Sequence, residues 1–140
     1  MQGNRYTGLI GAYGDRLPLT PGARPISLGE GNTPLIRLEN LPVARDRDIE
    51  LYVKYEGLNP TASFKDRGMT VAVTQAVAEG SEAIICASPG NTSASAAAHA
   101  ARAGIKAFGL IPHGQLALGT LAPAIFDGAE GLPAPGHFDQ

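Results

Sequence analysis

The sequence has few residues from which to build disulfides or metal sites. Its 140 residues include one cysteine, no tryptophan and three histidines. Because Cys86 stands alone, an internal disulfide and a thiolate zinc site are excluded. We expect Cys86 to be a small buried side chain. The histidines, among them His99, show no zinc-motif spacing, so we expect no metal centre and predict that each is structural or solvent-exposed.

Charge is also scarce. Charged residues make up 17% of the chain and the formal net charge is −2, which is not the composition of a disordered polyelectrolyte or of a protein that binds nucleic acid or an anionic membrane. The longest uncharged window, residues 107–126, is interrupted by glycine and proline, so it is not expected to span a membrane. The N-terminus lacks the apolar run of a signal peptide. We therefore expect a cytoplasmic protein.

Glycine and proline are plentiful, at 18 and 11 residues, without a collagen period. From residue 50 onward, apolar runs typical of strands alternate with helical patterns. The predicted strands are 50–56, 83–87 and 106–111, and the predicted helices are 63–80, 92–102 and 116–126. This alternation predicts an α/β fold of parallel βαβ units, with 83–87 as a buried strand. Pro133 and Pro135 argue against a central strand near the end of the chain.

Lys65 is the first candidate functional residue. Ser63 and Asp66 have the spacing of a capping box, which puts Lys65 in the first turn of a helix. The positive end of the helix dipole disfavours a cation there, and a neutral lysine amine is the group that attacks carbonyls. The alternative is that Lys65 pairs with Asp66 and faces solvent. We expect Asp66 and Arg67 to be surface or capping charges.

The second candidate is the loop Ser88–Thr92, which leads from a predicted strand into a helix. Such a loop, with Gly90 in it, makes a cradle for a carboxylate or phosphate, and Asn91 offers an amide to a ligand oxygen. The alternative is a simple turn with Thr92 as the N-cap. The loop has neither the P-loop nor the dinucleotide-binding pattern.

Three segments together resemble a known family. They read Glu-Gly-Asn-Thr-Pro-Leu at 30–35, Asn-Pro-Thr-Ala-Ser-Phe-Lys-Asp-Arg-Gly at 59–68 and Gly-Asn-Thr-Ser at 90–93. The chain, from about Leu9 to Gln140, resembles the threonine synthases. These belong to the tryptophan-synthase-β-like superfamily of enzymes that depend on pyridoxal phosphate.

The resemblance implies a function for each candidate. Lys65 would bind pyridoxal phosphate covalently and move protons at the substrate carbons. Asn91 would hydrogen-bond the phenolic oxygen of the cofactor, and Ser88, Gly90 and Thr92 would bind the substrate carboxylate. The implied reaction converts O-phosphohomoserine and water to threonine and phosphate, in an enzyme that is a homo-oligomer in this family.

The resemblance also implies a domain organisation. Residues 1–50 would pack on a larger domain, 51–128 would form the smaller α/β domain with the cofactor lysine, and 129–140 would be a degraded tail. Because the family is more than twice this length, we expect a fold truncated after the smaller domain, with weak or absent cofactor binding and no turnover. Two alternatives remain: a non-catalytic association module of the same fold, and a lyase similar to serine/threonine dehydratase.

Overall fold

The computed structural model describes residues 5–87, 90–112 and 128–134. The helices are α1 (Leu9–Tyr13), α2 (Pro42–Asp46), α3 (Lys65–Ala78) and α4 (Asn91–Ala103), with short 3-10 helices η1 (Gly14–Arg16) and η2 (Glu56–Leu58). The strands are β1 (Leu35–Arg37), β2 (Tyr52–Lys54), β3 (Ala83–Cys86), β4 (Lys106–Pro112) and β5 (Glu130–Ala134).

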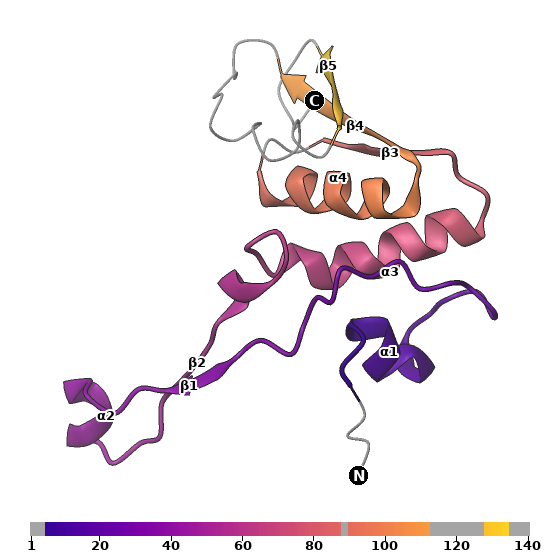
Figure 1. Ribbon diagram of the computed structural model, residues 1–140. Helices are drawn as coiled ribbons and strands as arrows, with labels where there is room; N and C mark the ends of the chain where they lie inside the picture. Colours follow the sequence, from indigo (N-terminus) through magenta and orange to yellow (C-terminus); the bar gives the residue numbers. More distant parts are fainter. Residues whose placement is uncertain (1–4, 88–89, 113–127, 135–140) are drawn as a thin grey trace.

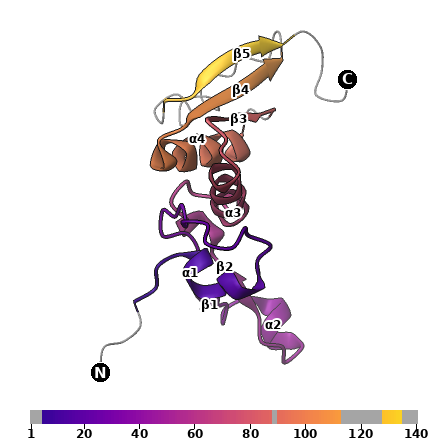
Figure 2. The same ribbon diagram turned by 90° about the vertical axis from the view of Figure 1, so that its right-hand side faces the viewer.

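These elements are stacked in layers (Figure 1). The sheet formed by β3, β4 and β5 lies against α4, and α4 packs along α3. On its far side, α3 meets the N-terminal segment that carries α1. The turned view in Figure 2 gives the same order of layers. Helices α3 and α4 begin at the same end of the stack, so their first turns lie near each other.

The predicted α/β fold with parallel strands is confirmed. In the described part of the chain the larger sheet has the order β3-β4-β5, and both pairs are parallel. Ala83 lies opposite Lys106, and Phe108 lies opposite Glu130. Pro133 lies in β5, at an edge of these three strands, where a missing backbone donor costs least. The predicted helix 116–126 lies outside the described residues.

The expectation that 83–87 is a fully buried strand is wrong. β3 exposes Ala83 and 63% of Ile85, while Ile84 packs towards α4 and Cys86 is half-buried. Successive side chains of a strand point to opposite faces. Of the described helices, α4 packs on β3 and β4, so alternate residues of β3 face away from it.

The strand predicted at 50–56 forms in part, but it does not join the parallel sheet. β2 pairs antiparallel with β1 in a separate two-stranded sheet, with Ile36 opposite Val53. Consecutive strands usually pair with each other, and here β1 and β2 are linked by the segment that holds α2. This hairpin with α2 extends away from the helices as an arm, residues 35–54 (Figures 1 and 2).

Glycine marks the C-terminal ends of α3 and α4. Gly104 adopts the left-handed conformation (φ 75°) directly after α4, and Gly80 adopts it (φ 85°) shortly after α3, as is typical of helix C-termini. The short helix α1 buries Ile10 and exposes Tyr13. No helix in the described ranges has the length and apolar composition needed to cross a bilayer.

The apolar core between α4 and the sheet is built from small side chains. Ala97, Ala100 and Ala107 form its buried cluster, and Ile84 and Ile105 pack against it. Ala100 has no solvent exposure, whereas the next residue of α4, Ala101, is exposed. Alanine at these positions lets α4 lie close to β4, which leaves no room for longer side chains.

Ala100→Leu tests this close packing. We expect it to lower the free energy of unfolding by about 1–3 kcal/mol, because an overpacked core forces side chains and backbone to shift. Ala101→Leu is the matched control and should change it by less than about 0.5 kcal/mol. Urea denaturation followed by circular dichroism measures both. Equal effects of the two variants would show that α4 is not packed closely on this side.

Candidate functional site

Lys65 is the first residue of α3. Its side chain is half-buried, and its Nζ lies 5.0 Å from the centre of the Phe64 ring, which is within cation–π range. None of the ion pairs in the described part of the chain includes Lys65. The alternative in which Lys65 pairs with Asp66 and faces solvent is therefore wrong. The amine is left without a carboxylate partner there.

The predicted capping box is also wrong. Phe64 is the N-cap residue of α3, without a side-chain cap hydrogen bond, and the Lys65 N–H lies 3.3 Å from Ser63 Oγ. Asp66 does not reach back to Ser63. Its Oδ2 accepts a hydrogen bond from the backbone N–H of Thr61 at 2.7 Å, and its Oδ1 accepts one from the Thr61 hydroxyl at 2.5 Å. The carboxylate thus holds the loop that leads into the helix.

The same carboxylate joins α3 to α4. Ser95 Oγ donates to Asp66 Oδ1 at 2.5 Å, and neither residue has any solvent exposure. The prediction that Asp66 is a surface or capping charge is therefore corrected: it is a buried, hydrogen-bonded group. Because Asp66 follows Lys65 directly and Ser95 lies one turn beyond Asn91, this bond brings the first turns of the two helices together.

Asn91 is the first residue of α4, and its side chain is exposed. Gly90, not Thr92, is the N-cap residue, so the predicted cap at Thr92 is wrong. Thr92 is half-buried in the first turn. Ser88 lies outside the described residues. The structure thus gathers Lys65, Asn91 and Thr92 at the adjoining starts of α3 and α4.

A second set of contacts, centred on the Glu56 carboxylate, also holds the loop before Lys65. Arg67, predicted as a surface charge, is half-buried and donates to both carboxylate oxygens of Glu56, at 2.6 and 2.8 Å. Thr33 Oγ and Asn59 Nδ2 donate to the same carboxylate at 2.8 and 2.9 Å. These bonds, chiefly those from Arg67, lower the pKa of Glu56 to about 2.

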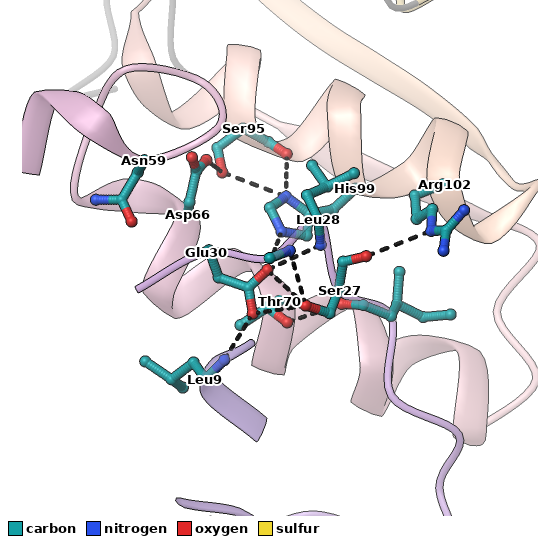
Figure 3. A network of polar contacts seen from close by, with 12 residues as sticks. Leu9, Ser27, Leu28, Glu30, Asn59, Asp66, Thr70, Ser95, His99 and Arg102 are labelled. Atoms are coloured by element: carbon teal, nitrogen blue, oxygen red, sulfur yellow. Dashed lines mark hydrogen bonds and ion pairs between the residues drawn. The ribbon is translucent and has the colours of Figure 1, made fainter. Parts of the chain in front are cut away.

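Glu30 is a carboxylate with no solvent exposure. It accepts the backbone N–H groups of Leu9 at 3.1 Å and Leu28 at 2.9 Å, and the hydroxyl of Ser27 at 3.0 Å (Figure 3). Burial acts to raise the pKa of Glu30, but the facing His99 and the hydrogen bonds from backbone N–H groups outweigh burial and lower it to about 2. The ionised carboxylate ties the N-terminal segment to the helices.

His99 links this carboxylate to α4. Its Nδ1 lies 2.8 Å from the Ser95 carbonyl oxygen, which only accepts, so we assign a proton to Nδ1. Its Nε2 faces Glu30 Oε2 at 3.8 Å and has no hydrogen-bond partner among the described residues. Of the two roles predicted for His99, the structural one is confirmed, because the side chain is fully buried.

Sequence reasoning missed Glu30 and Ser95 as parts of the site. The available signals were weak: Ser95 and His99 stand four residues apart, on one face of an alanine-rich helix, and Glu30 opens the segment 30–35 used for the family resemblance. Neither pattern shows that the two segments meet. That contact depends on how α4 packs against the N-terminal segment (Figure 3).

A comparison with known protein families shows to which family the chain belongs. A family model described as "Pyridoxal-phosphate dependent enzyme" matches residues 26–128. The chain belongs to this family. The match includes Lys65, Asn91 and the buried network of Glu30, Asp66 and His99.

Individual relatives of this family support the same assignment. A threonine synthase of Halalkalibacterium halodurans is 54% identical over 137 residues, which are 98% of this chain and 38% of that protein. A threonine synthase of Synechocystis is 50% identical over 97% of this chain and 36% of that protein. The chain therefore spans little more than a third of the length of these relatives.

Two solved structures share the fold of this chain. A hydrogen sulfide-producing enzyme from Fusobacterium nucleatum aligns with a TM-score of 0.64 and 31% identity, over 76% of this chain and 36% of that one. An O-ureido-L-serine synthase aligns with a TM-score of 0.66 and 28% identity, over 76% and 34%. The layers described above are thus also part of the fold of these two enzymes.

The described residues fit pyridoxal phosphate in their chemistry. The cofactor carries an aldehyde and a phosphate, and Lys65 offers a primary amine that no described carboxylate pairs with. The adjoining first turns of α3 and α4 present backbone N–H groups and the positive ends of two helix dipoles, which favour anions. Asn91 adds an exposed amide at the same place.

The lowered pKa of Glu30 predicts how the free energy of unfolding depends on pH. Because its pKa is lowered from 4.5 to about 2 in the folded state, it stabilises the fold above about pH 5, and this contribution is lost as the pH falls towards 2. The contribution is roughly 3 kcal/mol. Urea denaturation of the wild type and Glu30→Gln between neutral and acid pH measures it. We expect Glu30→Gln to be less stable at pH 7 and to lose less stability on acidification.

The exposed carboxylate Glu82 provides the control. Glu82→Gln should follow the wild-type curve. If Glu30→Gln instead ran parallel to the wild type at every pH, the buried carboxylate would not be the group that couples stability to pH.

Proposed function

We propose that this chain carries the cofactor lysine of a threonine synthase, with Lys65 as the residue that binds pyridoxal phosphate. The observation that carries the proposal is the Lys65 amine, which lies in no ion pair of the described residues, at the adjoining starts of two helices. The identity of about 54% to a threonine synthase supports the choice within the family. The proposed reaction converts O-phosphohomoserine and water to threonine and phosphate.

Each candidate has a role in this proposal. When bound, pyridoxal phosphate supplies an electron sink for chemistry at the substrate carbons. Lys65 would hold it through a bond from Nζ to the aldehyde carbon and would then carry protons to and from the substrate. Asn91 would donate to the phenolic oxygen of the cofactor. Ser88, Gly90 and Thr92 would bind the substrate carboxylate with hydroxyl and backbone donors at the start of α4.

From the resemblance to threonine synthases, the proposal extends to the domains, localisation and assembly of the protein. Residues 51–128 would form the smaller domain, with 1–50 on the larger domain and 129–140 as a tail. The protein would be cytoplasmic and would form homo-oligomers. That residues 1–140 alone turn over no substrate remains a prediction.

Trapping with borohydride tests the role of Lys65. Because we expect this chain alone to bind the cofactor weakly, it is mixed with a large excess of pyridoxal phosphate, reduced, digested and analysed by mass spectrometry. We expect the pyridoxyl group on Lys65 at a yield about tenfold above that on the exposed Lys106, because a positioned amine reacts faster than a free one. Lys65→Arg should abolish the visible absorption of the complex, and Asn91→Ala should weaken it.

Lys106→Arg is the control and should leave trapping at Lys65 unchanged. Equal labelling of Lys65 and Lys106 in the wild type would contradict the proposed site. Product analysis then separates two family chemistries in any active preparation: release of phosphate from O-phosphohomoserine supports threonine synthase, whereas formation of 2-oxobutyrate indicates a lyase similar to serine/threonine dehydratase.

A second candidate function, association without catalysis, is favoured by the arm formed by residues 35–54. Leu35 is 63% exposed, and Ile36, Tyr52 and Val53 are each at least 40% exposed. Because β1 and β2 pair only with each other in the described structure, their outer edges offer backbone groups to a further strand. The partner we propose is a second copy of this chain, paired through the arm.

Sedimentation velocity tests this association. We expect the wild type to form a dimer, and the double variant Ile36→Lys, Val53→Lys to sediment as a monomer, because charged side chains on this surface oppose pairing. Lys106→Arg serves again as the control and should behave as the wild type. A wild type that sediments as a monomer at all concentrations would exclude this candidate.

A further inference from the structure

Asp66 is a buried carboxylate without a cationic partner. It has no solvent exposure and belongs to no ion pair of the described residues. Removing a charge from water is costly unless hydrogen bonds replace the lost hydration. Three donors do so here, two from Thr61 and one from Ser95, at 2.5–2.7 Å. The positive end of the α3 dipole adds to them.

These donors come from two different segments. Thr61 belongs to the loop before Lys65, and Ser95 belongs to α4. Between Thr61 and Lys65 the chain passes through Ala62, whose φ of 60° is in the left-handed region that alanine rarely adopts. Such a conformation persists only where surrounding contacts hold it. The two hydrogen bonds from Thr61 to Asp66 are such contacts, and they fix the loop that leads to Lys65.

The α4 side of this contact is itself anchored. The Ser95 carbonyl accepts Nδ1–H of His99, and His99 faces Glu30, which accepts backbone N–H groups of the N-terminal segment (Figure 3). Asp66, Ser95, His99 and Glu30 all have no solvent exposure. Asp66 is therefore fixed to a buried framework, and Lys65 is joined to Asp66 by one peptide bond.

We propose that Asp66 is a positioning residue for the Lys65 amine. It holds the loop and the first turn of α3 against the first turn of α4, so that Nζ meets the aldehyde carbon of the cofactor in a fixed orientation near Asn91. In that reaction a bond forms from Nζ to the carbon, and the aldehyde oxygen leaves as water. This inference rests on the proposed function of Lys65.

Three variants of the full chain test the role. Asp66→Asn removes the carboxyl group, and Ser95→Ala keeps the carboxyl group but removes its hydrogen bond to α4. Thr74→Ala is the matched control: Thr74 lies on the same helix, is 1% exposed and accepts the backbone N–H of Ile26 at 2.9 Å. It should therefore lose stability without moving Lys65.

Two readouts are compared after thermal unfolding has ranked the variants. One is trapping of pyridoxal phosphate on Lys65 relative to Lys106. The other, which needs no cofactor, is the pH profile of reductive methylation at the same two lysines. We expect the trapping ratio to fall about tenfold in Asp66→Asn, about threefold in Ser95→Ala and less than about twofold in Thr74→Ala. The pH profile of methylation at Lys65 should shift in Asp66→Asn and Ser95→Ala and stay unchanged in Thr74→Ala.

The outcomes separate the two proposals. If wild-type Lys65 traps no cofactor, the proposed function fails, and the methylation profile still decides whether Asp66 positions the amine. If Lys65 traps the cofactor but Asp66→Asn behaves as Thr74→Ala does, the positioning role is overturned. If Asp66→Asn does not fold, the test rests on Ser95→Ala. The positioning role is then overturned if Lys65 in Ser95→Ala shows the same trapping ratio and methylation profile as in Thr74→Ala.

Discussion

A hydrogen bond between the Ser95 hydroxyl and the Asp66 carboxylate joins the two long helices close to where both begin. The contact is buried, so the two helices cannot shift apart at this end without breaking a hydrogen bond that water does not replace. The candidate lysine precedes Asp66 and the candidate amide lies one turn before Ser95. The geometry of the site therefore depends on this contact between α3 and α4.

The two sides of α4 use different chemistry. Towards the sheet, α4 packs with alanine side chains, whose small size allows a close approach to β4. Towards α3 and the N-terminal segment, it presents Ser95 and His99 to buried carboxylates. Hydrogen bonds have directions and apolar contacts do not. The polar side thus sets the orientation of α4, while the apolar side holds it to the sheet.

Much of the fold was predictable because its signals are local. The C-terminal glycines of α3 and α4, the strands β3 and β4, and the position of Lys65 in the first turn of a helix all follow from patterns within a few residues. The exposure of β3 did not follow, because it depends on which faces of the sheet are covered. The antiparallel pairing of β2 did not follow either, because a strand pattern does not specify its partner.

For the site, the sequence by itself determined the chemical groups: an amine at 65, an amide at 91 and the family to which their flanking residues belong. Only the tertiary structure decided what surrounds them. Asp66 has the spacing of a helix cap in the sequence, yet in the fold it binds Thr61 and Ser95. The physical reason is that a carboxylate binds whichever donors packing brings to it, and Ser95 comes from a helix 29 residues away along the chain.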